Sequence, residues 1–404
     1  MAIVGAGPAG LALSCALADA GLRVDVLEQQ PLSALEAPAD DGREIALTWR
    51  SRRLMEALGL WRSLPPQAIA PLREARVLDG GYARALRFAP AAPTRSPLGW
   101  LVANHRIRAA AFDAARRRPG VRLRGEARVD GLALAPDGAC VTLAGGERVG
   151  AALVVAADSR FSPTRRMAGI GAAMRDFGRS VIVACLAHAR PNEGIAWECF
   201  RYGNTLALLP MNGGRASAVV TLPTAAVDEW LALTDAEFAA RVERQSGGRL
   251  GGLRMAGERH HFPLVSAYAD RFVARRFALV GDAAVGMHPV TAHGWNLGLQ
   301  GVQALARELA SAHAAGRDIG AAPPLLAFER AHRRATWPTY AGTNALVSLF
   351  TDERAPAKLL RRAVLDVAAR LPPFDALVQS LVLRQLTGDD GVAASLLSQK
   401  GMTP

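Results

Sequence analysis

Residues 5–10 read Gly5-Ala6-Gly7-Pro8-Ala9-Gly10. They follow a short apolar segment at residues 2–4 and precede an apolar, alanine-rich segment that extends to about residue 20. This order predicts a β-strand, a glycine-rich turn and an α-helix. A second strand is expected over residues 24–28, so the chain opens with a β-α-β unit. The opening strand is short, which leaves open whether residues precede Met1.

The spacing of these glycines suits the pyrophosphate of a dinucleotide. Gly5, Gly7 and the adjoining Ala9 would let the backbone turn tightly beside the phosphates, whose charge is favoured by the helix N-terminus. Gly10 would permit close packing of the helix on the strand. Glu28, at the end of the second strand, can accept hydrogen bonds from an adenosine ribose. We therefore expect a dinucleotide here; the alternative is a glycine-rich turn without a ligand.

A second group of motifs lies about 270 residues later. An apolar segment leads into Gly281-Asp282, and two motifs follow within 15 residues: Met287-His288-Pro289 and Ala292-His293-Gly294-Trp295-Asn296-Leu297. Together with the opening stretch they resemble the group A FAD-dependent aromatic monooxygenases, the family of para-hydroxybenzoate hydroxylase. The resemblance implies that FAD is the cofactor, with Asp282 on the ribityl hydroxyls and Pro289 beside the flavin ring.

Gly294, Trp295 and Asn296 begin a predicted helix that extends to about residue 314 and carries an apolar face. Its positive N-terminal end would point at the flavin and stabilise the anionic reduced form by roughly 0.3 to 2 kcal/mol. The resemblance therefore adds these three residues to the predicted cofactor site.

A third motif stands between the other two: Val154-Val155-Ala156-Ala157-Asp158-Ser159-Arg160. It resembles a family motif in which the aspartate contacts the cofactor and supports the use of NAD(P)H, so Asp158 is expected there. Ser159 stands where the family usually has glycine. Because glycine permits backbone angles that serine resists, the local turn is expected to differ. The alternative is an ordinary polar turn after a buried strand.

The resemblance extends over essentially the whole chain to the ubiquinone-biosynthesis hydroxylases (UbiH- and UbiF-like), and to the UbiM-like branch in particular. The motifs that carry it include Arg43-Glu44-Ile45-Ala46-Leu47, Leu58-Gly59-Leu60-Trp61 and Thr291-Ala292-His293-Gly294-Trp295-Asn296. It implies that Arg43 lies near the cofactor and Arg106 near its phosphates; the alternative for each is a solvated arginine. His293 is the candidate catalytic residue, with structure or flavin packing as the alternative. No histidine spacing indicates a metal site.

The implied activity is hydroxylation of the aromatic ring of a ubiquinone precursor, for example a 5-demethoxyubiquinol-type compound, with NAD(P)H and O2 as co-substrates. Three alternatives stay open at this point. The chain could hydroxylate a soluble aromatic compound, reduce isoprenoid chains, or serve as a non-catalytic flavin-binding subunit of a quinone-biosynthesis complex.

We expect an α/β fold: a Rossmann-like FAD-binding domain of the para-hydroxybenzoate hydroxylase type, a β-sheet substrate lobe and a helical C-terminus. The expected domains are 1–177 for FAD binding with an irregular excursion at 62–100, 178–265 for the mainly β substrate lobe, 266–340 completing the FAD-binding domain, and a helical 341–404. Helices are predicted at 43–61 and 106–117. Strands are predicted at 141–143, 152–156, 181–186, 195–200, 205–209, 216–222, 260–264 and 277–280.

Composition limits the remaining possibilities. Of 404 residues, 50% are hydrophobic and 21% charged, which is typical of a folded globular protein. The four cysteines are widely spaced without a C-x-x-C motif, which favours the reduced cytosol. Of the 48 basic residues behind the net charge of +12, only Lys358 and Lys400 are lysine, which indicates compositional bias and no nucleic-acid partner. The alternative is attraction to an anionic membrane surface. No apolar stretch suits a membrane span.

We therefore expect a cytoplasmic protein with peripheral contact to the inner membrane or to a quinone-biosynthesis complex. The segment 357–404, where apolar residues alternate with arginines, is the candidate surface for that contact. The alternative is a C-terminal helix packed on the core.

Overall fold

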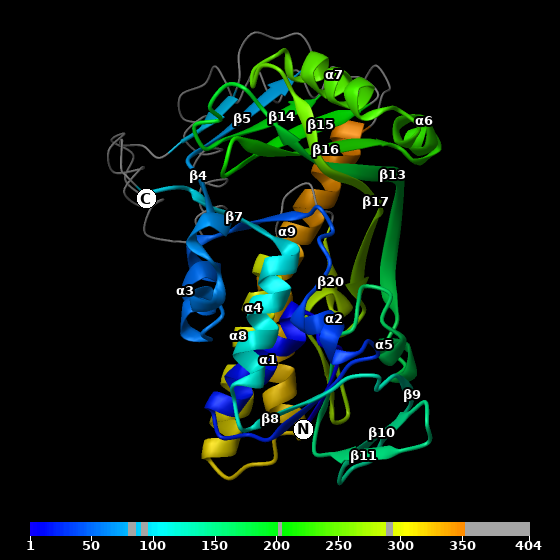
Figure 1. Ribbon diagram of the computed structural model, residues 1–404. Coiled ribbons are helices and arrows are strands. Elements are labelled where there is room, and N and C mark those ends of the chain that lie inside the picture. Colours follow the sequence, from blue (N-terminus) through cyan, green and yellow to red (C-terminus); the bar gives the residue numbers. More distant parts are fainter. Residues whose placement is uncertain (80–85, 90–95, 201–203, 288–293, 352–404) are drawn as a thin grey trace, which may run out of the picture.

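The computed structural model (Figure 1) describes residues 1–79, 86–89, 96–200, 204–287 and 294–351. The expected α/β class is confirmed. One part is built on a mainly parallel sheet with helices packed beside it, and the other part on a large, mainly antiparallel sheet.

The six-stranded sheet has β1 (Ala2–Val4) at its centre, paired in parallel with β2 (Val24–Leu27) and β12 (Val154–Ala156). The outer strands are β8 (Val121–Arg124) beside β2, and β19 (Phe277–Leu279) and β18 (Val273–Ala274) beside β12. Only the β18–β19 pair is antiparallel. The carboxyl ends of β1, β2, β12 and β19 therefore meet at one edge, where α/β sheets bind ligands.

Three helices pack together beside this sheet: α1 (Pro8–Asp19), α4 (Asn104–Arg116) and α8 (Gly294–Ala314). Their buried faces repeat at helical spacing; on α8 the face comprises Leu299, Val302, Leu305 and Leu309. The helix α9 (Ala322–Thr351) packs on α8, while α2 (Leu32–Glu36) and α5 (Pro163–Met167) are short connections.

The eight-stranded sheet has the order β20-β17-β13-β16-β15-β14-β5-β6. Its members are β5 (Glu74–Asp79), β6 (Leu86–Phe88), β13 (Ala172–Ala187), β14 (Ile195–Phe200), β15 (Thr205–Met211), β16 (Arg215–Pro223), β17 (Arg254–Ala269) and β20 (Val285–Gly286). The helices α6 (Val227–Leu231) and α7 (Asp235–Ser246) cover its outer face. The long strands β13 and β17 run from this sheet down to the other part of the molecule (Figure 1).

Two three-stranded sheets complete the fold. One contains β9 (Val129–Leu134), β10 (Ala139–Leu143) and β11 (Arg148–Ala151). The other has β7 (Gly99–Ala103) between β3 (Glu44–Leu47) and β4 (Ala70–Leu72). It lies between the eight-stranded sheet and the helices, because β4 and β7 contact β15, β7 contacts α4 and β3 contacts α8.

Two sequence predictions were wrong. The helix expected over 43–61 is the strand β3 followed by α3 (Trp49–Ala57), because Thr48 caps α3 and pairing with β7 extends the residues before it. The excursion at 62–100 is not merely irregular. It contributes β4, β5, β6 and the start of β7, and β5 pairs in parallel with β14, which lies about 120 residues away in sequence. Such long-range pairing leaves no local signal.

The other predicted strands and the helix near 106–117 are confirmed, with shifted ends. The domain boundaries stay a prediction. Among the helices of the described ranges, none combines the length and the apolar character needed to cross a bilayer.

Candidate functional site

The glycines of residues 5–10 occupy positions with different constraints. Gly5 has φ +102°, and a Cβ atom there would lie 2.7 Å from the Asp158 Cα. A Cβ at Gly10 would collide with the carbonyl oxygen of Gly5, whereas one at Gly7 would meet nothing nearer than the Ala157 carbonyl oxygen at 3.9 Å. Packing within the chain therefore requires Gly5 and Gly10 but leaves the space beside Gly7 free. A ligand phosphate that approaches the backbone would use that space.

Glu28 lies at the next strand end and turns back toward the glycine-rich turn. One carboxylate oxygen accepts the backbone N–H of Ala6 at 2.8 Å, and the other accepts that of Gln30 at 3.0 Å. A carboxylate offers about four acceptor positions, so each oxygen keeps capacity for a ribose hydroxyl. The predicted role of Glu28 is compatible with this geometry.

Asp158 follows β12 at the same edge. Its Oδ2 accepts the backbone N–H of Thr164 at 3.3 Å, while its Oδ1 is buried and has no hydrogen-bond partner in the described structure. An unpaired buried carboxylate oxygen is costly, so this atom suits a donor from a ligand. The backbone at position 159 does not require glycine, because Ser159 is not among the described non-glycine residues with positive φ.

Asp282 follows β19 and completes the edge. Its Oδ2 accepts from the Arg160 Nη2 at 2.9 Å, and Arg160 also donates to the Val265 carbonyl oxygen at 2.7 Å. Arg165 is buried and donates to the Ala283 carbonyl oxygen at 3.0 Å. These arginines fix the motif after β12 to the Gly-Asp turn about 120 residues later. The sequence motifs did not predict this pairing.

Ala9 ties the first motif to the second. At Gly281, where φ is +60°, a Cβ would lie 2.8 Å from the Ala9 Cβ, so the two turns touch. We call the edge formed by Gly5–Gly10, Glu28, Asp158 and Asp282 the cofactor edge.

The first turn of α8 lies against this edge. The Asn296 side chain accepts the Thr48 N–H at 3.2 Å and donates to the Ala46 carbonyl oxygen at 2.8 Å, which fixes the helix start. The Trp295 Nε1 is buried without a partner in the described structure. His293 and Pro289 lie outside the described residues, and Gly294 is the first residue of the helix.

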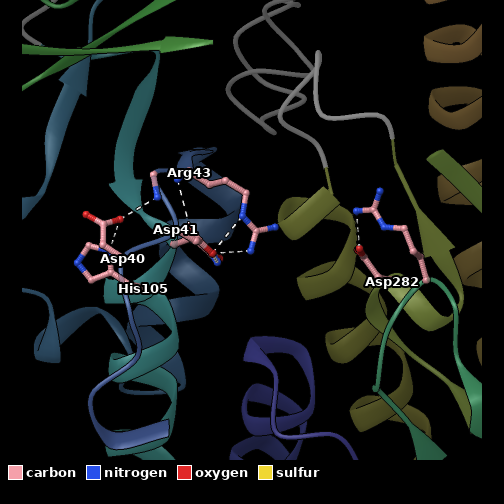
Figure 2. Close-up of polar contacts among 8 residues, drawn as sticks. Asp40, Asp41, Arg43, His105 and Asp282 are labelled. Carbon is pink, nitrogen blue, oxygen red and sulfur yellow. Dashed lines mark hydrogen bonds and ion pairs between the residues drawn. The ribbon is translucent and has the colours of Figure 1, made fainter. Parts of the chain in front are cut away.

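Arg43 belongs to a charged cluster before β3 (Figure 2). It donates to Asp41 through Nε at 3.1 Å and Nη2 at 2.6 Å, and its guanidinium lies 5.1 Å from the centre of the Phe262 ring. Burial opposes ionisation of Asp41, but hydrogen bonds from Arg43 and Asn104 hold its pKa below the usual range. Arg106 is exposed on α4. In Figure 2 this cluster and Asp282 lie on either side of the helix that begins at Gly294.

The face of the eight-stranded sheet opposite α6 and α7 carries a second set of residues. The strand register aligns one row of side chains across six strands, and we call the face they share the inner face: Val77, Glu198, Ala207, Val219, Val183 and His260. Alternation places their strand neighbours, such as Leu206 and Leu208, in the core under α6 and α7.

The inner face meets the cofactor part of the chain at one end. A Cβ at Gly42 would lie 2.8 Å from the His260 Cδ2 and 3.6 Å from the Val183 Cγ1, so the loop that carries Arg43 rests on this face. Ala207, Val219 and Glu198 are all only partly buried. Small, partly accessible side chains therefore line the face of the sheet that the Arg43 loop contacts, an arrangement suited to an apolar ligand.

Two carboxyl groups in this region have raised pKa values. Burial raises the pKa of Glu198 to about 7. Burial, with help from Asp40, raises the pKa of Glu44 to about 8 against the opposing effect of Arg215. Sequence reasoning missed both. For Glu198 a signal existed, since it is the one charged residue in the strand sequence Ile195-Ala196-Trp197-Glu198-Cys199-Phe200.

Within the described residues no cluster of His, Cys, Asp or Glu is suited to hold a metal ion.

Residues 1–320 match the FAD binding domain family. The chain is 43% identical to the ubiquinone hydroxylase UbiM of Neisseria meningitidis, over 96% of this chain and 84% of that protein. It is 39% identical to the ubiquinone hydroxylase UbiL of Rhodospirillum rubrum, over 93% of this chain and 87% of that protein. Its fold is similar to that of p-nitrophenol 4-monooxygenase PnpA from Pseudomonas putida, with TM-score 0.75 and 18% identity over 96% and 97% of the two chains.

Proposed function

The chain belongs to the FAD binding domain family of flavin-dependent monooxygenases, and we propose that it hydroxylates the aromatic ring of a ubiquinone precursor, using NAD(P)H and O2. The observation that carries the proposal is the 43% identity to a ubiquinone hydroxylase over nearly the whole chain. The sequence predictions of this family, of FAD as cofactor and of a monooxygenase are confirmed.

The residues of the cofactor edge fit FAD. Gly7 leaves room for the pyrophosphate, Glu28 has free acceptor capacity for the ribose, and the unpaired Asp158 Oδ1 can accept from a ligand hydroxyl. Asp282 would bind the ribityl chain while Arg160 holds its carboxylate in place. These assignments, with Gly5, Ala9, Gly10, Arg43, Arg106, Pro289, Gly294, Trp295 and Asn296, are our proposed cofactor site. His293 stays a proposed catalytic residue.

When bound, FAD supplies the redox chemistry, taking electrons from NAD(P)H and delivering them to O2. The chain contributes binding, orientation and exclusion of water. The N-terminus of α8, held by the contacts of Asn296 to Ala46 and Thr48, directs a positive dipole end toward the cofactor edge. The apolar inner face keeps water from the reacting ring.

The substrate class has a consequence for location. A ubiquinone precursor carries a polyisoprenoid tail that is costly to expose to water. We propose that the protein collects it at the inner membrane or from a quinone-biosynthesis complex, by way of residues 357–404. That segment lies outside the described residues.

The proposal is tested by complementation. The full-length protein, produced in bacteria that lack single ring hydroxylases, should restore quinone in one of the strains, and the purified protein should be yellow and release FAD on denaturation. Removal of residues 357–404 should abolish complementation while FAD stays bound. The contrary outcome is failure in every strain, together with NAD(P)H oxidation stimulated by a small soluble phenol.

A further inference from the structure

Glu198 is a partly accessible residue whose carboxyl group is largely enclosed by protein, and the cofactor site does not use it. We infer that Glu198 is a catalytic residue, whose carboxylate accepts the proton of the ring hydroxyl while the substrate is hydroxylated. The inference rests on the proposed function and adds a proton acceptor that the proposal leaves unassigned.

The strand register places Glu198 on the inner face. It stands between Val77 of β5 and Ala207 of β15, both in register with it. The preceding Trp197 and following Cys199 belong to the core under α6 and α7, so the Glu198 side chain points to the opposite face. Ala196, two residues earlier on the same face, packs on Leu72 and Leu98 next to β7. Glu198 therefore lies on the face that contacts β4 and the start of β7 here and, at His260, the loop that carries Arg43.

Its surroundings offer no compensation for a charge. Glu198 makes no hydrogen bond or ion pair in the described part of the chain, and burial is the sole cause of its raised pKa. Glu74 and Arg76 of β5 lie on the other face, where Arg76 stacks on Trp197 and pairs with Glu74. An uncompensated buried carboxyl destabilises a fold, so its presence indicates a functional role.

Of the other titratable groups on the inner face, Arg215 lies two strands from Glu198, where it acts electrostatically on Glu44 and Cys185. On the strands beside Glu198 this face carries the apolar Ala75, Val77, Ala207 and Leu209, and the register also aligns Thr205 and Asp79 with Phe200, two residues after Glu198. Cys185 lies three strands away and His260 four, or about 14 and 19 Å at the usual strand spacing. Arg43 rests on Phe262, in the same strand as His260. A ring bound beside Val77 and Ala207 would therefore exchange its proton with Glu198.

The chemistry suits a carboxyl of this kind. A phenol resembles the tyrosine side chain, with a pKa near 10 in water, and ionisation makes the ring more electron-rich. Burial raises the pKa of Glu198 to about 7, which makes it a stronger base than an exposed glutamate. The O–H bond of the ring breaks, its proton joins Glu198, and the electron pair stays on the ring oxygen.

The proton then returns. One atom of O2 becomes the oxygen that the ring carbon gains, and the other leaves as water, with two electrons from NAD(P)H and one proton from solvent consumed. The ring carbon loses its hydrogen as a proton when aromaticity is restored. The ring oxygen takes back the proton held by Glu198, which ends as a carboxylate. One turnover thus leaves Glu198 unchanged.

Glu44 is the competing carboxyl, since burial also raises its pKa, to about 8. It differs in its neighbours, because Asp40, Asp41 and Arg215 all act on it electrostatically. It belongs to the charged cluster at the edge of the sheet and not to the apolar row. The two carboxyls can be distinguished by parallel substitutions.

The test uses Glu198→Gln in the FAD-loaded full-length protein, with a short-tailed demethoxyubiquinol as substrate. We expect hydroxylated product to form at least about 100-fold more slowly at pH 7, as for loss of a general base. FAD content should be unchanged, and NAD(P)H oxidation should continue without product. Raising the pH toward 10 should restore much of the rate, because the substrate then ionises unaided.

Matched controls are Glu258→Gln, an exposed glutamate on β17, and Glu44→Gln. Both should retain the fall in rate below about pH 7, which Glu198→Gln should lose. If Glu198→Gln folds poorly, Glu198→Asp replaces it and should reduce the rate while keeping the acid limb. Wild-type product formation by Glu198→Gln across pH 6–9, or loss of the acid limb in Glu44→Gln alone, would overturn the inference.

A binding measurement separates this inference from the proposed function. The pH at which a bound chromogenic nitrophenol ionises should rise in Glu198→Gln relative to the wild type, after subtraction of the flavin spectrum. This arm needs no turnover. If the wild type hydroxylates no quinone precursor, the proposed function fails; an unchanged ionisation pH in the variant overturns the role of Glu198 in either case.

Discussion

The cofactor edge and the inner face differ in how tightly they are packed. At the cofactor edge a Cβ at Gly10 would collide with the carbonyl oxygen of Gly5. On the inner face Ala207, Val219 and Glu198 keep part of their surface accessible. The first region is specified by short motifs, each of which can be recognised locally, because a phosphate-binding turn needs glycine at fixed spacing. The second is assembled from strands that lie up to about 180 residues apart. A cofactor site can thus be recognised from local motifs, whereas a substrate site on a sheet depends on register.

The largest expected effect tests the tight packing of the cofactor edge. Gly10→Ala should give little soluble protein and no bound FAD, because the new methyl group overlaps the Gly5 carbonyl oxygen and α1 would have to move. Gly7→Ala is the matched control and should fold as the wild type, with weaker FAD binding. Soluble yield and flavin per polypeptide measure both. A soluble, yellow Gly10→Ala would contradict the described packing.

The next effect concerns the far end of the same edge. Asp282→Ala should weaken FAD binding by a factor of about 10 to 150, since a charge-assisted hydrogen bond contributes about 1.5 to 3 kcal/mol. Asp235→Ala, which removes an exposed carboxylate from its ion pair with Arg259, should not change the FAD affinity. Titration of the apoprotein with FAD, followed by flavin fluorescence, gives both affinities. If Asp282→Ala binds FAD as tightly as the wild type, Asp282 does not belong to the cofactor site.

The inner face is tested by two substitutions on the same sheet. Ala207→Leu projects into the accessible side and should raise KM for the aromatic substrate by about 10-fold, or about 1.4 kcal/mol, with FAD binding unchanged. Ala218→Leu projects into the filled core under α7 and should instead destabilise the fold by about 1–3 kcal/mol. Thermal unfolding and steady-state kinetics distinguish them. Identical behaviour would show that the two faces do not differ as described.

The smallest effect is a pH dependence of stability at the junction of the two regions. The folded-state pKa of Glu44 is about 8, above the usual 4.5, so the folded protein holds a proton that the unfolded chain has released. Its contribution is fully present below pH 4.5 and is lost as the pH rises through about 8. Between pH 5 and pH 9 the free energy of unfolding of Glu44→Gln should therefore rise by roughly 1 kcal/mol relative to that of the wild type, a value kept small because solvent screens a partly exposed carboxyl. Urea unfolding at pH 5 and pH 9 measures the free energy of unfolding of both proteins. A fall in the stability of Glu44→Gln relative to the wild type over this range would contradict the prediction.

Much of the cofactor edge could be predicted from the sequence. The β-α-β unit, the turn at Gly281 and the helix from Gly294 are where the motifs indicate, because each needs particular residue types within a short span. At Ser159 the φ is not positive, so the backbone does not require glycine there; the expectation that the turn differs from that of the family stays a prediction.

The strand predictions show the limit. Residues 44–47 have a composition that suits a helix, but pairing with β7 makes them a strand. The pairing of β5 with β14 could not be anticipated, because parallel strands separated by 120 residues carry no local sign of their partnership.

The sequence by itself determined the cofactor, the family and the order of the main elements, since backbone contacts to a dinucleotide impose fixed residue types at fixed spacing. Only the tertiary structure decided which side chains share the inner face. Register and alternation brought Glu198 next to Val77 and Ala207 and left its carboxyl without a partner in the described chain. The physical reason is that burial and the pKa it raises depend on neighbours from distant strands, which no stretch of sequence contains.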